Sequence, residues 1–252
     1  MTVFQRTIPY DVLAGTSLPG VAAMAPKDWL VFDDAYAGQM ARREALFKQN
    51  RSDVLQIDES AQPAAQELLS TVLDFLADAR AGFQISSKHV QCPDGRIVLI
   101  DPADPMLTLG RLVQDDFCIL QKPSGFDEHI LTAAILCFPA NWRLAQKFMR
   151  PLTHIHVPVE EYTDDIAKRV QRLFDGIKVG RPMWRHNALW YSDPELFQPA
   201  RGGTNPKPVG GGTGPYMRSE RQTLLRLPLT GAVVFGIHTF LVRAKDLPSP
   251  ST

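Results

Sequence analysis

The chain has 252 residues, of which 44% are hydrophobic and 21% charged, so it is long enough to bury a sizeable core. Lys plus Arg and Asp plus Glu number 27 each, giving a formal net charge of zero, which argues against a nucleic-acid-binding protein. No apolar run long enough to span a membrane occurs, and residues 1–13 lack the apolar segment of a signal peptide. These features predict a soluble, cytoplasmic protein.

The first part of the chain, residues 1–80, is predicted to be mainly helical. Asp33 or Asp34 can cap a helix. That helix carries three ring or thioether side chains on one face: Tyr36, Met40 and Phe47. A second helix is expected from Pro63, because proline suits the first turn. Its apolar residues recur at helical spacing: Leu68, Leu69, Val72, Leu73 and Leu76.

Residues 84–243 are expected to form a sheet-containing core. Strands are predicted at 84–92 and 96–100 around a Pro-Asp-Gly turn, and at 116–121, 130–138, 183–191, 218–227 and 232–243. Two inserted helices are predicted, one over 142–149 capped by Asn141 and one capped by Thr163. The second helix turns Ile166, Val170 and Phe174 inward and Lys168, Arg169 and Arg172 outward.

Residues 194–215 are rich in Gly and Pro and are predicted to be a flexible loop. Helices followed by an antiparallel sheet with further helices inserted indicate the α+β class. We expect one domain over residues 1–252.

The chain carries no familiar signature of a nucleotide-binding or hydrolytic enzyme. The glycines between 202 and 214 are followed by Pro215-Tyr216 rather than by the Lys-Ser/Thr of a P-loop, and GxGxxG, GxSxG and HExxH are absent. The cysteines, Cys92, Cys118 and Cys137, are isolated, which disfavours a disulfide framework, an all-cysteine zinc site or an iron–sulfur cluster.

The most informative histidines are His154 and His156. If extended, they would share one face, and with Glu160 they give the H-x-H-x3-E spacing of metal-binding cupin barrels. Alternatively one of them is an axial haem ligand, since neutral imidazole suits iron. A third interpretation is that neither binds anything.

A second constellation is the charged block from Arg218 to Leu224. On a strand, Arg218, Glu220 and Gln222 share one face, and Arg221 lies on the other. The simplest interpretation is a solvated edge strand. A functional interpretation places these charges at a site.

The chain resembles the haem-dependent oxidative N-demethylase family, formerly a domain family of unknown function. The blocks that carry the resemblance run in family order. They are Val113-Gln114-Asp115-Asp116, Leu131–Pro139, Trp142-Arg143-Leu144-Ala145, Arg150-Pro151-Leu152, Ile155-His156-Val157-Pro158-Val159, Arg181-Pro182-Met183-Trp184-Arg185, Arg218–Leu224 and Arg226-Leu227-Pro228.

The resemblance implies a PAS-like fold that binds haem b and acts as the oxygenase subunit of a larger complex. It implies oxidation of a small secondary amine such as dimethylamine by O2, yielding methylamine and formaldehyde. Electrons would come from NADPH through reductase partners. FMN, a [2Fe–2S] cluster and tetrahydrofolate are expected on those partners, because this chain lacks their signatures.

The resemblance makes His156, rather than His154, the expected axial ligand, because His156 lies in the Ile-His-x-Pro-Val block. Cationic partners suit haem propionates, and the candidates are Arg143, Arg181 and Arg185. Glu220 is the expected counter-charge for a cationic amine, and Arg218 or Arg221 the expected donor to iron-bound oxygen. Two alternatives remain: a haem-based PAS gas sensor or haem carrier without turnover, and a cupin-like metal enzyme.

Overall fold

The computed structural model describes residues 3–12, 20–78, 81–156, 164–199 and 214–247. Within these residues, a seven-stranded antiparallel sheet has the order β1-β8-β9-β10-β6-β7-β2. Its strands are β1 (Ala22–Ala23), β2 (Leu55–Ile57), β6 (Asp116–Gln121), β7 (Ile130–Ile135), β8 (Met183–Tyr191), β9 (Tyr216–Arg226) and β10 (Val233–Arg243). A separate three-stranded sheet is formed by β3 (Gln84–Ile85), β4 (His89–Gln91) and β5 (Ile97–Leu99).

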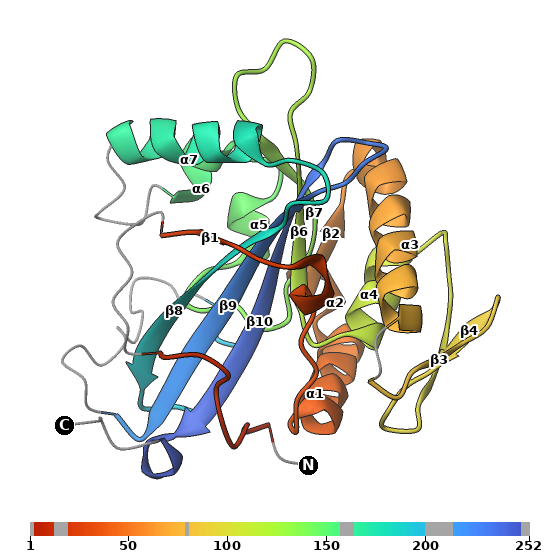
Figure 1. Cartoon of the computed structure of the whole chain (residues 1–252), viewed down its shortest axis with the longest axis vertical. Coiled ribbons are helices and arrows are strands. Elements are labelled where there is room, and N and C mark those ends of the chain that lie inside the picture. The colour runs from red at the N-terminus through yellow and green to blue at the C-terminus, as the bar shows by residue number, and fades with distance from the viewer. Residues whose placement is uncertain (1–2, 13–19, 79–80, 157–163, 200–213, 248–252) are drawn as a thin grey trace.

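Helices cover both faces of the large sheet (Figure 1). The N-terminal group packs on one face and consists of α1 (Tyr36–Gln49), α2 (Arg51–Val54), α3 (Gln62–Asp78) and α4 (Pro105–Leu112). The other face is covered by α5 (Leu144–Lys147), α6 (Leu152–His156) and α7 (Asp164–Gly176). The structure is therefore α+β, as the sequence predicts.

Alternation along the strands separates two hydrophobic cores. Phe117 and Ile119 of β6 point to the core under the N-terminal helices. Their neighbours Cys118 and Leu120 point to the core under α5, α6 and α7. Because successive strand residues face opposite sides, each strand contributes to both cores.

Most of the predicted elements are confirmed, and β8 has the predicted bounds. The predicted strand 84–92 is wrong in one respect, because it breaks into two strands at a turn. In that turn the hydroxyl of Ser86 accepts hydrogen bonds from the N–H groups of Lys88 and His89. The helices α2, α4 and α6 and the strands β1 and β2 are not among the predicted elements.

The predicted helix 142–149 is wrong in length, since only Leu144–Lys147 is helical. Asn141 has a φ of 63° and Met149 a φ of 57°, and left-handed residues cannot continue a right-handed helix. Asn141 is therefore not its cap; Arg143 occupies that position without a side-chain cap.

Two predictions concern residues that are not described. Thr163 lies outside the described residues, as do residues 200–213 of the predicted loop 194–215. Within the described part of the helix that follows, Phe174 is buried while Arg169 and Arg172 are exposed, as predicted.

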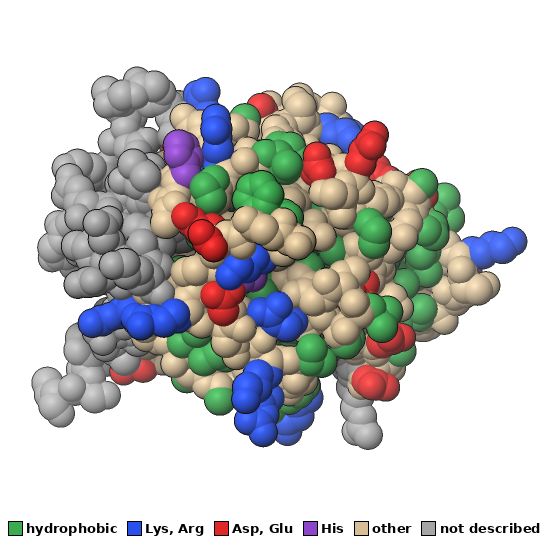
Figure 2. Space-filling model, turned by 90° about the horizontal axis from the view of Figure 1, so that it is seen from above, with side chains coloured by type: hydrophobic (Ala, Val, Ile, Leu, Met, Phe, Trp, Pro, Cys, Tyr) green, Lys and Arg blue, Asp and Glu red, His purple; other side chains and the backbone are tan. Residues whose placement is uncertain are grey.

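No helix of the described segments is long and apolar enough to cross a bilayer. On the face shown in Figure 2, Lys and Arg side chains are interspersed with Asp and Glu side chains and with hydrophobic ones.

Candidate functional site

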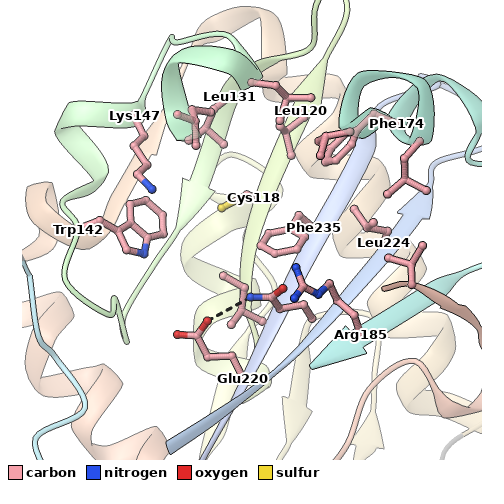
Figure 3. Close-up of a pocket in the computed structure, with 17 residues that line it drawn as sticks. Cys118, Leu120, Leu131, Trp142, Lys147, Phe174, Arg185, Glu220, Leu224 and Phe235 are labelled. Carbon is pink, nitrogen blue, oxygen red and sulfur yellow. Dashed lines mark hydrogen bonds between the residues drawn. The ribbon is translucent and has the colours of Figure 1, made fainter. Parts of the chain in front are cut away.

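The candidate site is a cavity of about 260 Å³ between the sheet and the helices α5, α6 and α7. We call it the larger cavity. Its floor is formed by one face of β6, β7, β8, β9 and β10, and its roof by apolar side chains of α6 and α7 together with Lys147 of α5 (Figure 3). The lining is mainly apolar and includes Leu120, Leu131, Leu152, Ile155, Val170, Leu173, Phe174, Leu224, Phe235 and Ile237.

Two cations, Lys147 and Arg185, line this apolar cavity. Neither lies within ion-pair distance of a carboxylate in the described part of the chain. The Nε of Arg185 is buried and has no hydrogen-bond partner among the described residues. Burial lowers the pKa of both side chains, that of Lys147 to about 8, and Glu220 only partly offsets this. Both side chains are half-buried, and a cation that is removed from water without a partner is costly, so the cavity suits a ligand that combines apolar surface with acidic groups.

A smaller cavity of about 160 Å³ adjoins the larger one, and we call it the smaller cavity. Trp142 and Glu220 line both cavities. The rest of its lining is Ala140, Asn141, Asn187, Leu189, Tyr191 and Arg218. A carboxylate that shares its cavity with two aromatic side chains, Trp142 and Tyr191, suits a small cation.

Neighbouring groups hold the carboxylate of Glu220 in place. Its Oε2 accepts hydrogen bonds from Asn187 Nδ2 at 3.1 Å and from Gln222 Nε2 at 3.2 Å (Figure 3 shows the second). Its Oε1 lies 3.7 Å from Nη2 of Arg218. The orientation follows from register, because Asn187 of β8 is paired directly with Glu220 of β9.

Arg218 is brought to Glu220 but is largely engaged with the backbone. Its Nη1 donates to the carbonyl of Leu196 at 3.1 Å and its Nη2 to that of Phe138 at 2.6 Å. Its Nε is buried without a partner among the described residues. Arg218 therefore ties β9 to two loops and has one donor to spare.

Arg221 is not brought to this site. It lies on the opposite face of β9, where its guanidinium donates to the backbone carbonyls of Trp29 at 2.9 Å and Asp28 at 2.6 Å. It also stacks 5.5 Å from the ring of Trp184. The expectation that only one of the two arginines shares a pocket with Glu220 is thus met by Arg218.

The alternative of a solvated edge strand for Arg218–Leu224 is wrong. β9 lies between β8 and β10 and pairs with both along its length. Arg218 and Arg221 are buried. The charges of the block are paired within the protein instead of being solvated.

The segment that carries His154 and His156 is helical rather than extended. In a helix, residues two apart do not share a face, which removes the geometric basis of the cupin-like alternative. No group of three metal-binding side chains occurs among the residues that were searched, which are the described ones. His154 is exposed, and the side chain of His156 lies outside what the structure describes, as does Glu160. Ile155, directly before His156, lines the larger cavity.

The three arginine candidates for propionates are placed differently. Arg185 lines the larger cavity. Arg143 is exposed and does not line either cavity. Arg181 is exposed and lines a separate surface hollow beside Met24 and Pro182.

All three cysteines are free and buried. Cys118 lines the larger cavity, but burial and the nearby Asp116 raise the pKa of its thiol to about 12. A thiol held in its protonated form is a poor ligand for a metal.

Three residues of the site are not identified by the sequence analysis: Lys147, Asn187, and Trp142, which lines both cavities. Asn187 lies two residues after Arg185 on β8, and side-chain alternation puts both on the same face. This spacing could have identified Asn187 from the sequence. The position of Lys147 depends on the shortened helix α5 and had no sequence signal.

One comparison with known proteins bears on this site. A family model described as haem-dependent oxidative N-demethylase, alpha subunit-like, matches residues 20–251. The match spans nearly the whole chain and confirms the resemblance drawn from the sequence blocks.

Proposed function

Because the chain belongs to the haem-dependent oxidative N-demethylase alpha-subunit-like family, we propose that it binds haem b in the larger cavity and oxidatively demethylates a small secondary amine. The observation that carries the proposal is an apolar cavity with unpaired cations, joined through Glu220 to a smaller polar cavity. The haem, when bound, supplies the chemistry of oxygen activation.

The residues of the larger cavity fit such a group. Apolar side chains of the sheet and of the helices face each other, which suits a flat macrocycle. Arg185, with its orphaned Nε, is our candidate to hold a propionate, since guanidinium and carboxylate pair well. Arg143 and Arg181 are weaker candidates, because their side chains are exposed and outside this cavity.

We assign the axial ligand to His156. The helix α6 directs Ile155 into the cavity wall and ends at the next residue, His156. Cys118, a soft donor that does line the cavity, is held as a protonated thiol by its raised pKa of about 12.

We assign amine recognition to Glu220 in the smaller cavity. A secondary amine is a cation at neutral pH, and its charge needs a partner when it leaves water. Trp142 and Tyr191 supply aromatic surface, and Glu220 supplies the charge. Arg218 orients Glu220 and contributes its free Nε as a donor toward oxygen. Arg221, bonded on the other face of the sheet, takes no part.

The strands β6 to β10 support a PAS-like core. Two strands precede the inserted helices α5, α6 and α7 and three follow them, with the spatial order β7-β6-β10-β9-β8. We propose that this core acts in the cytoplasm as one subunit of a complex. Its partners would pass electrons from NADPH and carry FMN, a [2Fe–2S] cluster and tetrahydrofolate.

The test of haem binding compares two histidines of the same helix. The purified chain is reconstituted with haem, and the Soret band is titrated for the wild type, His156→Ala and His154→Ala. We expect His156→Ala to lose or severely weaken haem binding, while His154→Ala, an exposed site, binds as the wild type does. Normal binding by His156→Ala with loss in His154→Ala would show the assignment to be wrong.

The test of turnover adds a reductase, NADPH and dimethylamine to the haem-loaded protein. Amine-stimulated NADPH oxidation with formaldehyde release supports the demethylase. Stable haem binding without any amine-dependent turnover would instead favour the gas sensor or haem carrier.

A further inference from the structure

Lys147, the last residue of α5, is a half-buried amine that lines the mainly apolar larger cavity. Its Nζ lies 4.2 Å from the ring centroid of Trp142, and Figure 3 shows the side chain directed toward that ring. The lysine has no carboxylate at ion-pair distance among the described residues, unlike Lys122, whose Nζ lies 3.1 Å from Asp175.

Burial favours the neutral amine, whereas the ring of Trp142 favours the charged form. Burial lowers the pKa of Lys147 to about 8, and Cys118 of β6 and Glu220 of β9 oppose the shift only in part. Arg185 of β8 is the other charged group in the same wall. With a pKa near 8, about a tenth of the amine is neutral at pH 7, roughly 300 times the fraction of an ordinary lysine.

We propose that Lys147 is a carbonyl-reactive amine that captures a small aldehyde beside Trp142, where the larger cavity meets the smaller one. The lone pair of Nζ attacks the carbonyl carbon and forms an N–C bond as the C=O π bond breaks, and a proton then passes from the nitrogen to the oxygen and gives a carbinolamine. Loss of water then leaves an imine. No oxidant or reductant is consumed, and hydrolysis returns both partners.

The class of electrophile follows from the cavity. A small uncharged carbonyl compound enters an apolar space without leaving a charge unpaired, and a neutral amine in such a space is an activated nucleophile.

The role of a carbonyl-reactive lysine at this position rests on the proposed function. Oxidation of an N-methyl group releases its carbon as formaldehyde, and Trp142 lines both the cavity of Lys147 and the cavity assigned to the amine. Lys147 would hold the aldehyde until a partner removes it, which keeps it from reacting elsewhere.

The experiment needs neither haem nor turnover. The purified chain is treated at pH 7 with limiting formaldehyde and cyanoborohydride, which reduces the imine to N-methyl-lysine, and methylation of each lysine is followed by peptide mass spectrometry. Lower basicity also weakens a nucleophile, so we expect Lys147 to react about tenfold faster than Lys122, less than the roughly 300-fold excess of neutral amine. Repeating the reaction from pH 6 to 11 should give Lys147 a midpoint near 8.

Two variants provide the controls. Lys147→Arg keeps the charge, removes the primary amine and should abolish the fast phase. Lys122→Arg, outside both cavities, should leave that phase unchanged. Equal rates for Lys147 and Lys122 in the folded wild type, or a midpoint above 10 for Lys147, would overturn the proposal. If the chain does not bind haem but Lys147 is still methylated rapidly, the proposed function is wrong while the proposal of a reactive amine is unaffected.

Discussion

Removal of the charge of Glu220 is the sharpest test of the amine site. Glu220→Gln preserves the shape of the side chain. Its amide can still pair with Asn187 and Gln222, which contact the carboxylate at 3.1 and 3.2 Å, because both partners carry amides that donate and accept. Arg218 keeps its two backbone carbonyl partners. The fold should therefore survive the substitution.

The magnitude follows from the contacts of the carboxylate. A charge-assisted hydrogen bond is worth about 1.5–3 kcal/mol net, which corresponds to an affinity loss of about tenfold to 150-fold. Arg218 already lies 3.7 Å from Oε1 and offsets part of the negative charge that the amine would meet. We therefore expect a loss nearer tenfold than 150-fold.

The assay is titration of dimethylamine into the ferric haem-loaded protein, with the Soret shift as readout. Saturation-transfer NMR of the same amine provides a second readout that does not depend on the haem. Glu44→Gln is the matched control, because Glu44 pairs with Arg111 on the surface and lies outside both cavities. Equal dissociation constants for the wild type and Glu220→Gln would refute the assignment.

Three further predictions concern stability and electron supply. Arg43→Met leaves Asp116 buried without its 2.6 Å partner, so urea unfolding should show a loss of about 3–5 kcal/mol; a loss below about 1 kcal/mol would contradict this. The pKa of His238 is raised to about 9 by Asp115 and Asp33 against the opposing effect of burial, so its stabilisation is complete below about pH 6.5 and is lost as the pH rises through 9. As the pH rises from about 6.5 through 9, the melting temperature of the wild type should fall relative to that of His238→Gln. If the melting temperatures of the two proteins change in parallel with pH, this prediction is wrong. The chain alone should not oxidise NADPH at a catalytic rate, and sustained turnover without a reductase would disprove partner dependence.

Elements with a strong local pattern could be predicted from the sequence. The periodic leucines of α3 and the long alternating strands β8, β9 and β10 are found where they were expected. The alternation of side chains along a strand also predicts that Glu220 and Arg221 lie on opposite faces of the sheet, because a strand fixes the face of each side chain.

Elements set by tertiary contacts could not be predicted. β2 has three residues and exists because it pairs with β7. α5 is short because Asn141 and Met149 are left-handed, and Met149 is held there by a hydrogen bond from its N–H to the carbonyl of Leu131 at 2.9 Å. Such a bond joins residues far apart in sequence and leaves no local signal.

The residues of the candidate site divide in the same way, into those with a local sequence signal and those placed by tertiary contacts. Arg185, Arg218 and Glu220 could be selected from the sequence, since charges in an apolar stretch are conspicuous. Lys147 could not be selected, because its exposure would be ordinary on the longer helix that was predicted. Arg43 is the converse case: a helical arginine normally faces water, yet this one is fully buried and donates to three backbone carbonyls as well as to Asp116.

The two faces of the sheet differ in how completely their charges are partnered. On the face under the N-terminal helices, Arg43, Arg221 and His238 each contact an oxygen partner at 2.6 to 3.2 Å. On the face under α5, α6 and α7, Lys147 and Arg185 line an apolar cavity without an ion-pair partner in the described segments. Desolvated cations cost free energy unless something compensates them. Under the proposed function, a propionate of the bound haem would supply the acidic partner that Arg185 lacks among the described residues.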